Sequence, residues 1–212
     1  MILLLVRHAV TSLTGKKLIG WTPGMSLSPQ GRKQAEDVAN RLAAVPVKAI
    51  YTSPLERCAE TADAIAGRHR LKPKPMEGLG EIRYGQWQGK SLKTLYRTKA
   101  WTQLRAQPAD FRFPDGETVR EAQTRAIGAI EQLRKKHRGS DAVVVCSHAD
   151  VIRLAVAGYI GLGIDLYSRI SIAPASVTVL SLGDTPPRLL RLGDLGGYDG
   201  MFGSDEAGKR VR

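Results

Sequence analysis

The sequence predicts an α/β protein: a three-layer αβα sandwich with a mainly parallel central sheet. Three short apolar runs, at residues 3–6, 48–52 and 141–147, end in polar or charged residues and alternate with amphipathic helical stretches. Runs of this length and composition are typical of strands buried on both faces. Strands that alternate with helices favour parallel pairing through right-handed crossovers, with helices covering both faces of the sheet.

Two serine–proline pairs indicate where the first two helices begin. A long glycine-containing loop covers residues 9–27, and residues 28–29 then place Ser at the N-cap and Pro at the first helical position. Residues 53–54 repeat this pattern after the second strand, which puts Arg57 in the first turn of the second helix. Because the helix dipole disfavours a cation there, Arg57 indicates either solvent exposure or a bound anion.

The second half of the chain predicts two strong helices and a less regular middle. Residues 81–89 are rich in Gly and aromatics and indicate irregular structure with packed rings, followed by a weakly amphipathic helical stretch at 91–107. Apolar residues at helical spacing predict a long helix from 118 to about 137 and a mostly apolar helix at 150–159. Further strands are expected at 170–173, 176–182 and 186–192.

Length and composition indicate one ordinary soluble domain. We expect residues 1–196 of the 212 to form it and residues 197–212, rich in Gly and charge, to be a flexible tail. Cys58 and Cys146 are far apart in the sequence. We expect each to be a small buried apolar side chain in a reducing compartment. Without a basic leader or a long apolar span, the sequence predicts a cytoplasmic location and no membrane.

The net charge of +12 narrows the choice of partner. It is compatible with nucleic acid, an anionic surface or acidic small substrates. The basic residues form no single stripe, no aromatics interleave with them, and no nucleic-acid-binding motif is present, so nucleic acid is not favoured. We expect an anionic small-molecule substrate, and the sequence leaves a homodimer open.

Three strand ends carry candidate site residues. Arg7 and His8 follow the first strand, Arg57 follows the second and His148 follows the strand at 141–147. Ligands in such sheets bind beyond the carboxyl ends of the strands, so the four side chains can converge there. Two Arg beside two His would repel a metal ion, and no GxSxG or P-loop is present. The set fits a phosphate dianion held by Arg and attacked by a neutral imidazole, with no metal or cofactor.

With these residues in place, the sequence resembles the histidine phosphatase superfamily, which includes the cofactor-dependent phosphoglycerate mutases and many phosphatases. Its opening Arg-His motif, its second Arg motif, its acidic motif, a Gly-Glu-Thr and a final Ser-His occur in family order. The matching segments are 7–11, 20–21, 27–35, 51–62, 81–89, 116–118 and 147–148. The resemblance covers roughly residues 2–182 and implies a phosphoglycerate mutase-like fold.

The resemblance implies a role for each motif residue. His8 would be the nucleophile that takes the phosphoryl group as a phosphohistidine. Arg7, Arg57 and His148 would hold the phosphoryl oxygens and bind the substrate. Glu81 would protonate the leaving oxygen and later activate water.

The same resemblance assigns the substrate mouth and shows three departures. Thr11, Thr14 and Gly20 would line the phosphate and substrate opening. Where the family has Gly after each His, this chain has Ala9 and Ala149, which we expect to fit provided that φ is not positive there. Thr14 replaces the usual Asn and shortens the reach of one hydrogen-bonding group, which affects substrate geometry.

The segment after the acidic motif favours phosphatase over mutase. Mutases of this family carry a longer segment with a paired Arg for the substrate carboxylate, whereas residues 89–114 are short and contain no Arg-Arg pair. A short segment gives water easier access to the phosphohistidine, which favours hydrolysis of a small phosphorylated metabolite. A mutase remains the same-fold alternative, and a nucleic-acid-binding protein or a catalytically silent scaffold are the non-enzyme alternatives. The physiological substrate stays open.

Overall fold

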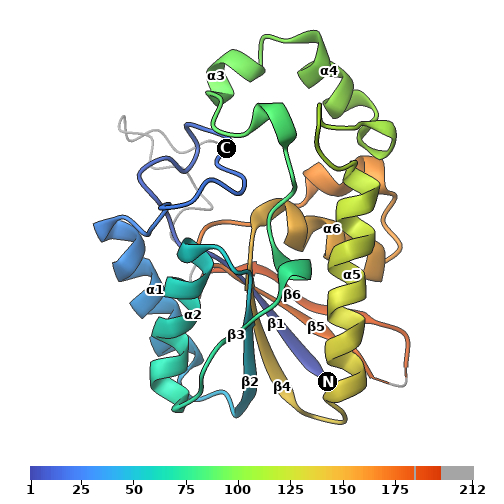
Figure 1. Ribbon diagram of the computed structural model, residues 1–212. Helices are drawn as coiled ribbons and strands as arrows, with labels where there is room; N and C mark the ends of the chain where they lie inside the picture. The colour runs from blue at the N-terminus through green and yellow to red at the C-terminus, as the bar shows by residue number, and fades with distance from the viewer. Residues whose placement is uncertain (184, 197–212) are drawn as a thin grey trace, which may run out of the picture.

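The computed structural model of the chain describes residues 1–183 and 185–196 and shows alternating strands and helices (Figure 1). The strands are β1 (Ile2–Arg7), β2 (Val47–Thr52), β3 (Lys74–Pro75), β4 (Ala142–Ser147), β5 (Val177–Ser181) and β6 (Arg188–Asp194). The α-helices are α1 (Pro29–Leu42), α2 (Glu56–His69), α3 (Leu92–Leu95), α4 (Lys99–Ala106), α5 (Val119–Lys136) and α6 (Ala149–Tyr159). Short 3₁₀ turns are η1 (Glu77–Leu79), η2 (Gly85–Trp87), η3 (Pro108–Asp110) and η4 (Ile164–Arg169). The expected tail at 197–212 lies outside the described residues.

The six strands form one sheet in the order β3-β2-β4-β1-β5-β6. β3, β2, β4 and β1 pair in parallel, while β5 runs antiparallel to both β1 and β6. The predicted α/β fold with a mainly parallel central sheet is confirmed. Because β1 lies between β4 and β5, the residues that follow β1 reach the middle of the carboxyl edge.

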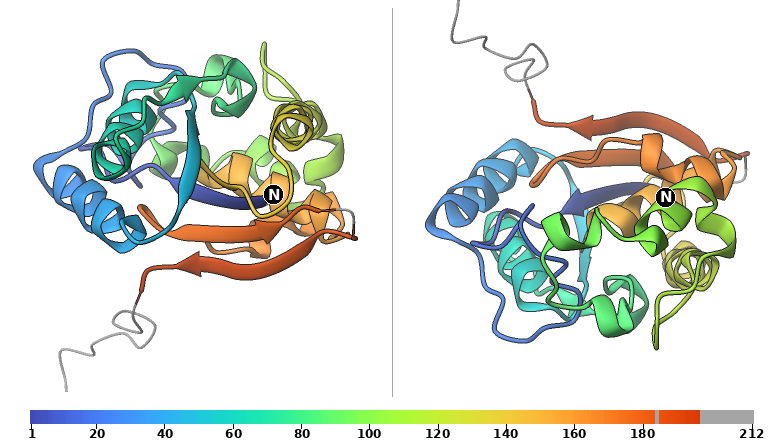
Figure 2. Two further views of the ribbon diagram at one scale, coloured as in Figure 1. Left: turned by 90° about the horizontal axis from the view of Figure 1, so that it is seen from below. Right: turned by 90° about the horizontal axis from the view of Figure 1, so that it is seen from above.

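Alternate side chains of the central strands face two apolar cores. Leu4 and Val6 of β1 pack with α1 and α2, whereas Leu3 and Leu5 pack with α5 and α6. Figure 2 shows the two helix pairs on opposite sides of the sheet. This two-sided burial explains why the strands read as continuous apolar runs. Cys58 and Cys146 are buried free thiols, as predicted.

The segment between η2 and α5 covers the carboxyl ends of the strands and is called here the cap segment (residues 90–113; Figure 1). The prediction of one helical stretch over 91–107 was wrong in its continuity. Thr98 has an extended backbone and its hydroxyl accepts the Trp101 N–H at 3.1 Å, so a new helix, α4, begins there. The two short helices place Tyr96 and Trp101 side by side, with ring centroids 4.8 Å apart.

Two further sequence predictions were wrong. α2 begins at Glu56, not at Ser53-Pro54, because Leu55 keeps an extended backbone; the Ser53 hydroxyl accepts the Leu55 N–H at 3.3 Å and is also bonded to His148 at 2.8 Å. Residues 170–173 form no strand, since the carbonyls of Ile170 and Ile172 accept hydrogen bonds from Arg side chains. Neither Ala9 nor Ala149 has a positive φ, as expected. No helix in the described part of the chain is long and apolar enough to cross a membrane.

Candidate active site

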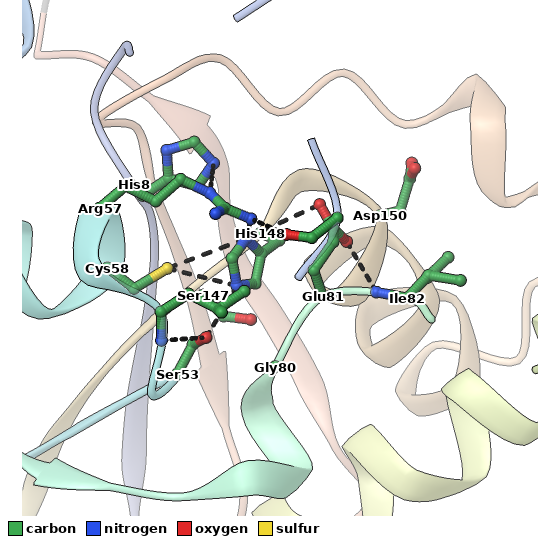
Figure 3. A network of polar contacts seen from close by, with 12 residues as sticks. His8, Ser53, Arg57, Cys58, Gly80, Glu81, Ile82, Ser147, His148 and Asp150 are labelled. Carbon is green, nitrogen blue, oxygen red and sulfur yellow. Dashed lines mark hydrogen bonds and ion pairs between the residues drawn. The ribbon is translucent and has the colours of Figure 1, made fainter. Parts of the chain in front are cut away.

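The carboxyl edge of the sheet brings the two Arg and two His residues of the sequence motifs together. Arg7 ends β1 and His8 follows it, Arg57 lies in the first turn of α2, and His148 is the N-cap residue of α6. Glu81 reaches the same place from the irregular segment between η1 and η2 (Figure 3). The catalytic roles assigned to these residues stay a prediction.

His8 is held as a neutral imidazole whose Nε2 carries no proton. Its Nδ1 lies 2.7 Å from the Ala9 carbonyl oxygen, which can only accept, so Nδ1 carries the proton. Its Nε2 accepts the Nε–H of Arg57 at 3.3 Å. Burial, Arg57 and Arg7 lower the pKa of His8 to about 3, while the Ala9 hydrogen bond opposes them. His8, 6% exposed, is therefore unprotonated on Nε2 at neutral pH, the form in which an imidazole can act as a nucleophile.

Two guanidinium groups, that of Arg57 buried and that of Arg7 half-buried, lie near His8 and form no ion pair with a carboxylate of the described residues. Arg57 is 1% exposed, and its Nη2 donates to the Gly20 carbonyl oxygen at 2.9 Å, while its Nη1 has no partner in the described part of the chain. Arg7 donates from Nη1 to the Ile172 carbonyl oxygen at 2.7 Å, and its buried Nε has no partner either. Because unpaired buried charges are costly, these free N–H groups indicate a binding site for an anion.

His148 is fully buried and bonded on both ring nitrogens. Its Nδ1 lies 3.2 Å from Arg57 Nη2, which can only donate, so Nδ1 accepts and Nε2 carries the proton. The Nε2–H then donates to Ser53 Oγ at 2.8 Å. Burial and Arg57 lower the pKa of His148 well below its ordinary value, so its 3.6 Å approach to Glu81 is not an ion pair at neutral pH.

Glu81 is a carboxyl group that keeps its proton into the neutral range. Burial is the main cause, and Asp150 adds to it, so the pKa of Glu81 rises to about 7 despite the opposing charge of Arg57. Its Oε1 accepts the Ile82 N–H at 3.0 Å, and its side chain is 13% exposed. A carboxyl with this pKa can give and take a proton near pH 7, as general acid–base catalysis requires.

A cavity of about 560 Å³ connects this cluster to the cap segment. Its inner end is formed by Arg7, His8, Arg57 and Glu81. The cap segment contributes an apolar wall with one charge. These lining residues are Leu92, Tyr96, Trp101, Leu104, Arg105, Pro108 and Phe113. The space is far larger than a phosphate group, so a substantial leaving group fits.

The predicted mouth residues divide between lining and support. Thr14 and Gly20 line the cavity, whereas Thr11 and His148 do not. The Thr11 N–H donates to Thr14 Oγ1 at 2.9 Å, so Thr11 holds Thr14 in place. Gly20 has a φ of +57°, and a Cβ there would press on Gln88 and Tyr84, which explains the requirement for glycine next to Arg57.

Sequence reasoning missed four residues of this site. Ser53 contacts His148, and Asp150 bonds to both Tyr84, at 3.1 Å, and Arg153, at 2.8 Å. Asp150 and Arg153 follow His148 within the first turns of α6, and that closeness was the available signal. In the described residues no group of three or more His, Cys, Asp or Glu side chains could hold a metal ion. The expectation of no cofactor stays a prediction.

The fold and the cluster define an α/β protein with two His and two Arg residues gathered at the carboxyl edge of its sheet. The chain belongs to the histidine phosphatase superfamily, branch 1, whose family model matches residues 3–195. The resemblance seen in the sequence is therefore confirmed.

Known relatives include both phosphatases and mutases. The chain is 28% identical to phosphoserine phosphatase 1 of Hydrogenobacter thermophilus over 90% of each chain. It is 25% identical to the 2,3-bisphosphoglycerate-dependent phosphoglycerate mutase of Thermoplasma acidophilum over 94% of this chain and 96% of that one. Among solved structures, Bacillus stearothermophilus YhfR matches with a TM-score of 0.85 and 26% identity over 92% of this chain and 97% of that chain.

Proposed function

We propose that the protein hydrolyses phosphomonoesters of a small phosphorylated metabolite through a phosphohistidine formed on His8. The observation that carries this proposal is the arrangement around His8 Nε2. The unprotonated Nε2, which accepts the Arg57 Nε–H, lies beside two guanidinium groups whose Arg7 Nε and Arg57 Nη1 have no partner among the described residues. A phosphate dianion would satisfy those donors and present its phosphorus to the nucleophile.

In the first step His8 Nε2 attacks phosphorus in line while the bond from phosphorus to the leaving oxygen breaks. Glu81 gives its proton to that oxygen, so the substrate leaves as a neutral alcohol and Glu81 becomes a carboxylate. Arg7 and Arg57 spread the charge that develops on the three phosphoryl oxygens. In the second step Glu81 takes a proton from water, the water oxygen attacks phosphorus, and the bond to His8 breaks.

His148 stays in the predicted catalytic set, with a role that its contacts make more specific. Its Nδ1 accepts from Arg57 Nη2, and its ring lies 5.3 Å from that of His8, but it does not line the cavity. In this arrangement His148 orients Arg57, and Arg57 would hold the phosphoryl oxygens.

Substitution of the proposed nucleophile tests the function. His8→Ala should abolish turnover of p-nitrophenyl phosphate, because within residues 1–183 and 185–196 no other imidazole Nε2 lies beside the two Arg residues. His69→Gln is a matched control at the far end of α2, and it should retain activity. Incubation with labelled substrate should trap a phosphoryl adduct that is acid-labile and base-stable. Substantial activity of His8→Ala, or an adduct on serine, would contradict the assignment.

Leaving-group dependence tests the proposed acid. Glu81→Gln should slow substrates with poor leaving groups, such as alkyl phosphates, more than p-nitrophenyl phosphate, whose phenolate needs no proton. Equal losses for both substrates would remove Glu81 from the acid role.

The mutase is the second candidate function. Relatives of both kinds match the chain, but residues 89–114 lack a paired Arg. A panel of phosphomonoesters that includes 3-phosphoglycerate with 2,3-bisphosphoglycerate separates the two. Release of inorganic phosphate supports the phosphatase, whereas accumulation of 2-phosphoglycerate supports the mutase.

Five sequence expectations remain proposals alongside this function. The phosphorylated small molecule is the proposed partner, nucleic acid is not, and residues 1–196 are proposed to act as one domain. A cytoplasmic location is proposed from the sequence. A homodimer remains an option, which light scattering of the purified protein would test.

A further inference from the structure

The Gly-Glu-Thr motif contributes to an ion pair that the proposed chemistry does not use. Glu117 precedes α5 and Arg125 lies two turns into that helix. Arg125 Nη2 lies 2.6 Å from Glu117 Oε1, and its Nε donates to Glu117 Oε2 at 3.2 Å. The side chains are only 20% and 11% exposed, so this two-pronged pair is the most buried Arg–carboxylate pair of the described residues.

Both members of this ion pair form hydrogen bonds with the backbone of the segment that contains Glu81. Arg125 Nη1 donates to the carbonyl oxygens of Gly78 at 2.9 Å and Gly80 at 3.0 Å, and Nη2 donates to that of Glu81 at 3.2 Å. Glu117 Oε1 accepts the Arg83 N–H at 2.9 Å, and the Glu117 N–H donates to the Arg83 carbonyl oxygen at 3.0 Å. The backbone on both sides of Glu81 is therefore held by one ion pair.

A tryptophan holds the same peptide from another side. Trp21 Nε1 donates to the Glu81 carbonyl oxygen at 2.7 Å, so this oxygen receives two side-chain donors. A Cβ at Gly80 would overlap the Trp21 ring, which explains the glycine just before Glu81. The Arg83 guanidinium lies 4.3 Å from the centre of the Trp21 ring.

We propose that Arg125 and Glu117 are positioning residues that set the Glu81 carboxyl at the distance and angle needed for proton transfer to the leaving oxygen. This inference rests on the proposed function. Glu81 lies between η1 and η2, outside any helix or strand, so no regular backbone ladder places its side chain. The Arg125–Glu117 ion pair with its hydrogen bonds to the backbone around Glu81, called here the clamp, fixes this segment instead. Neither Arg125 nor Glu117 lines the cavity, so neither touches the substrate.

The clamp predicts a defect that depends on the leaving group. Arg125→Lys keeps the charge, but one ammonium group cannot reproduce the planar fork and three carbonyl contacts. Because general acid catalysis contributes about 10²- to 10⁴-fold, loose placement of Glu81 should cost about 10- to 100-fold in kcat for alkyl phosphates. Turnover of p-nitrophenyl phosphate should fall less than about threefold, because its leaving group needs no acid. Glu117→Gln should show the same pattern.

The experiment measures kcat and KM for a series of phosphomonoesters whose leaving groups differ in pKa. Variants are Arg125→Lys, Arg125→Met and Glu117→Gln, each alone and combined with Glu81→Gln. Arg134→Met is the matched control: Arg134 also lies in α5, pairs with Glu131 and donates to a backbone carbonyl, that of Gly183 at 2.7 Å. It should leave the leaving-group dependence unchanged. Thermal unfolding of each variant shows which ones fold, and Arg125→Lys or Glu117→Gln carry the test if Arg125→Met does not.

The expected result is a steeper dependence of kcat on leaving-group pKa than in the wild type, and a slope in each double variant no steeper than that of Glu81→Gln alone. Equal losses across the series, or losses that add to those of Glu81→Gln, would overturn the clamp while the proposed function stands. If Glu81→Gln itself slows all substrates alike, the acid assignment fails first and the clamp with it. If His8→Ala remains active, the proposed function fails whatever Arg125 does.

Discussion

Removal of the Glu81 charge should stabilise the protein at alkaline pH while it impairs the proposed chemistry. Burial raises the pKa of Glu81 from 4.5 to about 7. Below pH 4.5 the carboxyl is protonated in folded and unfolded chains alike, so its ionisation changes nothing. As pH rises, the unfolded chain loses the proton first, and the folded state loses stability until the pH has passed about 7. Glu81→Gln removes this loss.

The size of the effect follows from the shift. One pKa unit corresponds to about 1.4 kcal/mol. The wild-type carboxyl therefore costs about 3 kcal/mol of folding free energy at pH 8 and about 1 kcal/mol at pH 5. For a chain of this length, Glu81→Gln should raise Tm by about 6–12 °C at pH 8. The amide oxygen can still accept the Ile82 N–H that Glu81 Oε1 now accepts at 3.0 Å.

Thermal unfolding of wild type and Glu81→Gln, followed by circular dichroism at pH 5 and pH 8, tests this reasoning. Glu121→Gln is the control, because hydrogen bonds from Arg112 and the Thr118 N–H lower the pKa of that exposed carboxyl, so its removal should not stabilise. Equal Tm values for wild type and Glu81→Gln at pH 8 would refute the pKa argument. A gain of the same size at both pH values would assign the effect to packing instead of ionisation.

Three further predictions concern turnover, specificity and folding. For an alkyl phosphate, kcat/KM should fall as pH rises above about 7, because deprotonated Glu81 cannot act as acid; a profile that stays flat to pH 9 would exclude it. Trp101 stacks on Trp87 and lines the outer cavity. Trp101→Ala should therefore raise KM for naphthyl phosphate about tenfold and leave KM for glycerol phosphate unchanged. Equal changes in both KM values would mean that the substitution disturbs the whole site. The Thr118 hydroxyl accepts the Glu121 N–H in a capping box, so Thr118→Ala should lower the unfolding free energy by about 1 kcal/mol in urea titrations. No loss would show that the cap does not limit stability.

Much of the fold could be predicted because local signals and global structure agree. The runs that became β1, β2 and β4 are apolar throughout, since helices cover both faces of these strands. Ser28 caps α1 as predicted, with its hydroxyl accepting the Gly31 N–H at 3.0 Å. The break at Thr98 within 91–107 is local, whereas the other two errors lie where side chains from distant parts of the chain contact local groups. His148 engages the Ser53 hydroxyl, and Arg7 takes the carbonyl of Ile172 that a strand would have used.

The sequence by itself determined the class of fold, the family and the set of residues at the strand ends, because strand periodicity and motif order are properties of the linear chain. Only the tertiary structure decided how those residues are poised. The Ala9 carbonyl fixes the His8 proton on Nδ1 and leaves Nε2 unprotonated, and burial near Asp150 raises the pKa of Glu81 to about 7. Arg125 donates a hydrogen bond to the Glu81 carbonyl oxygen, although the two residues are 44 positions apart in the sequence. Such contacts depend on distance and solvent exclusion, which residue order alone does not specify.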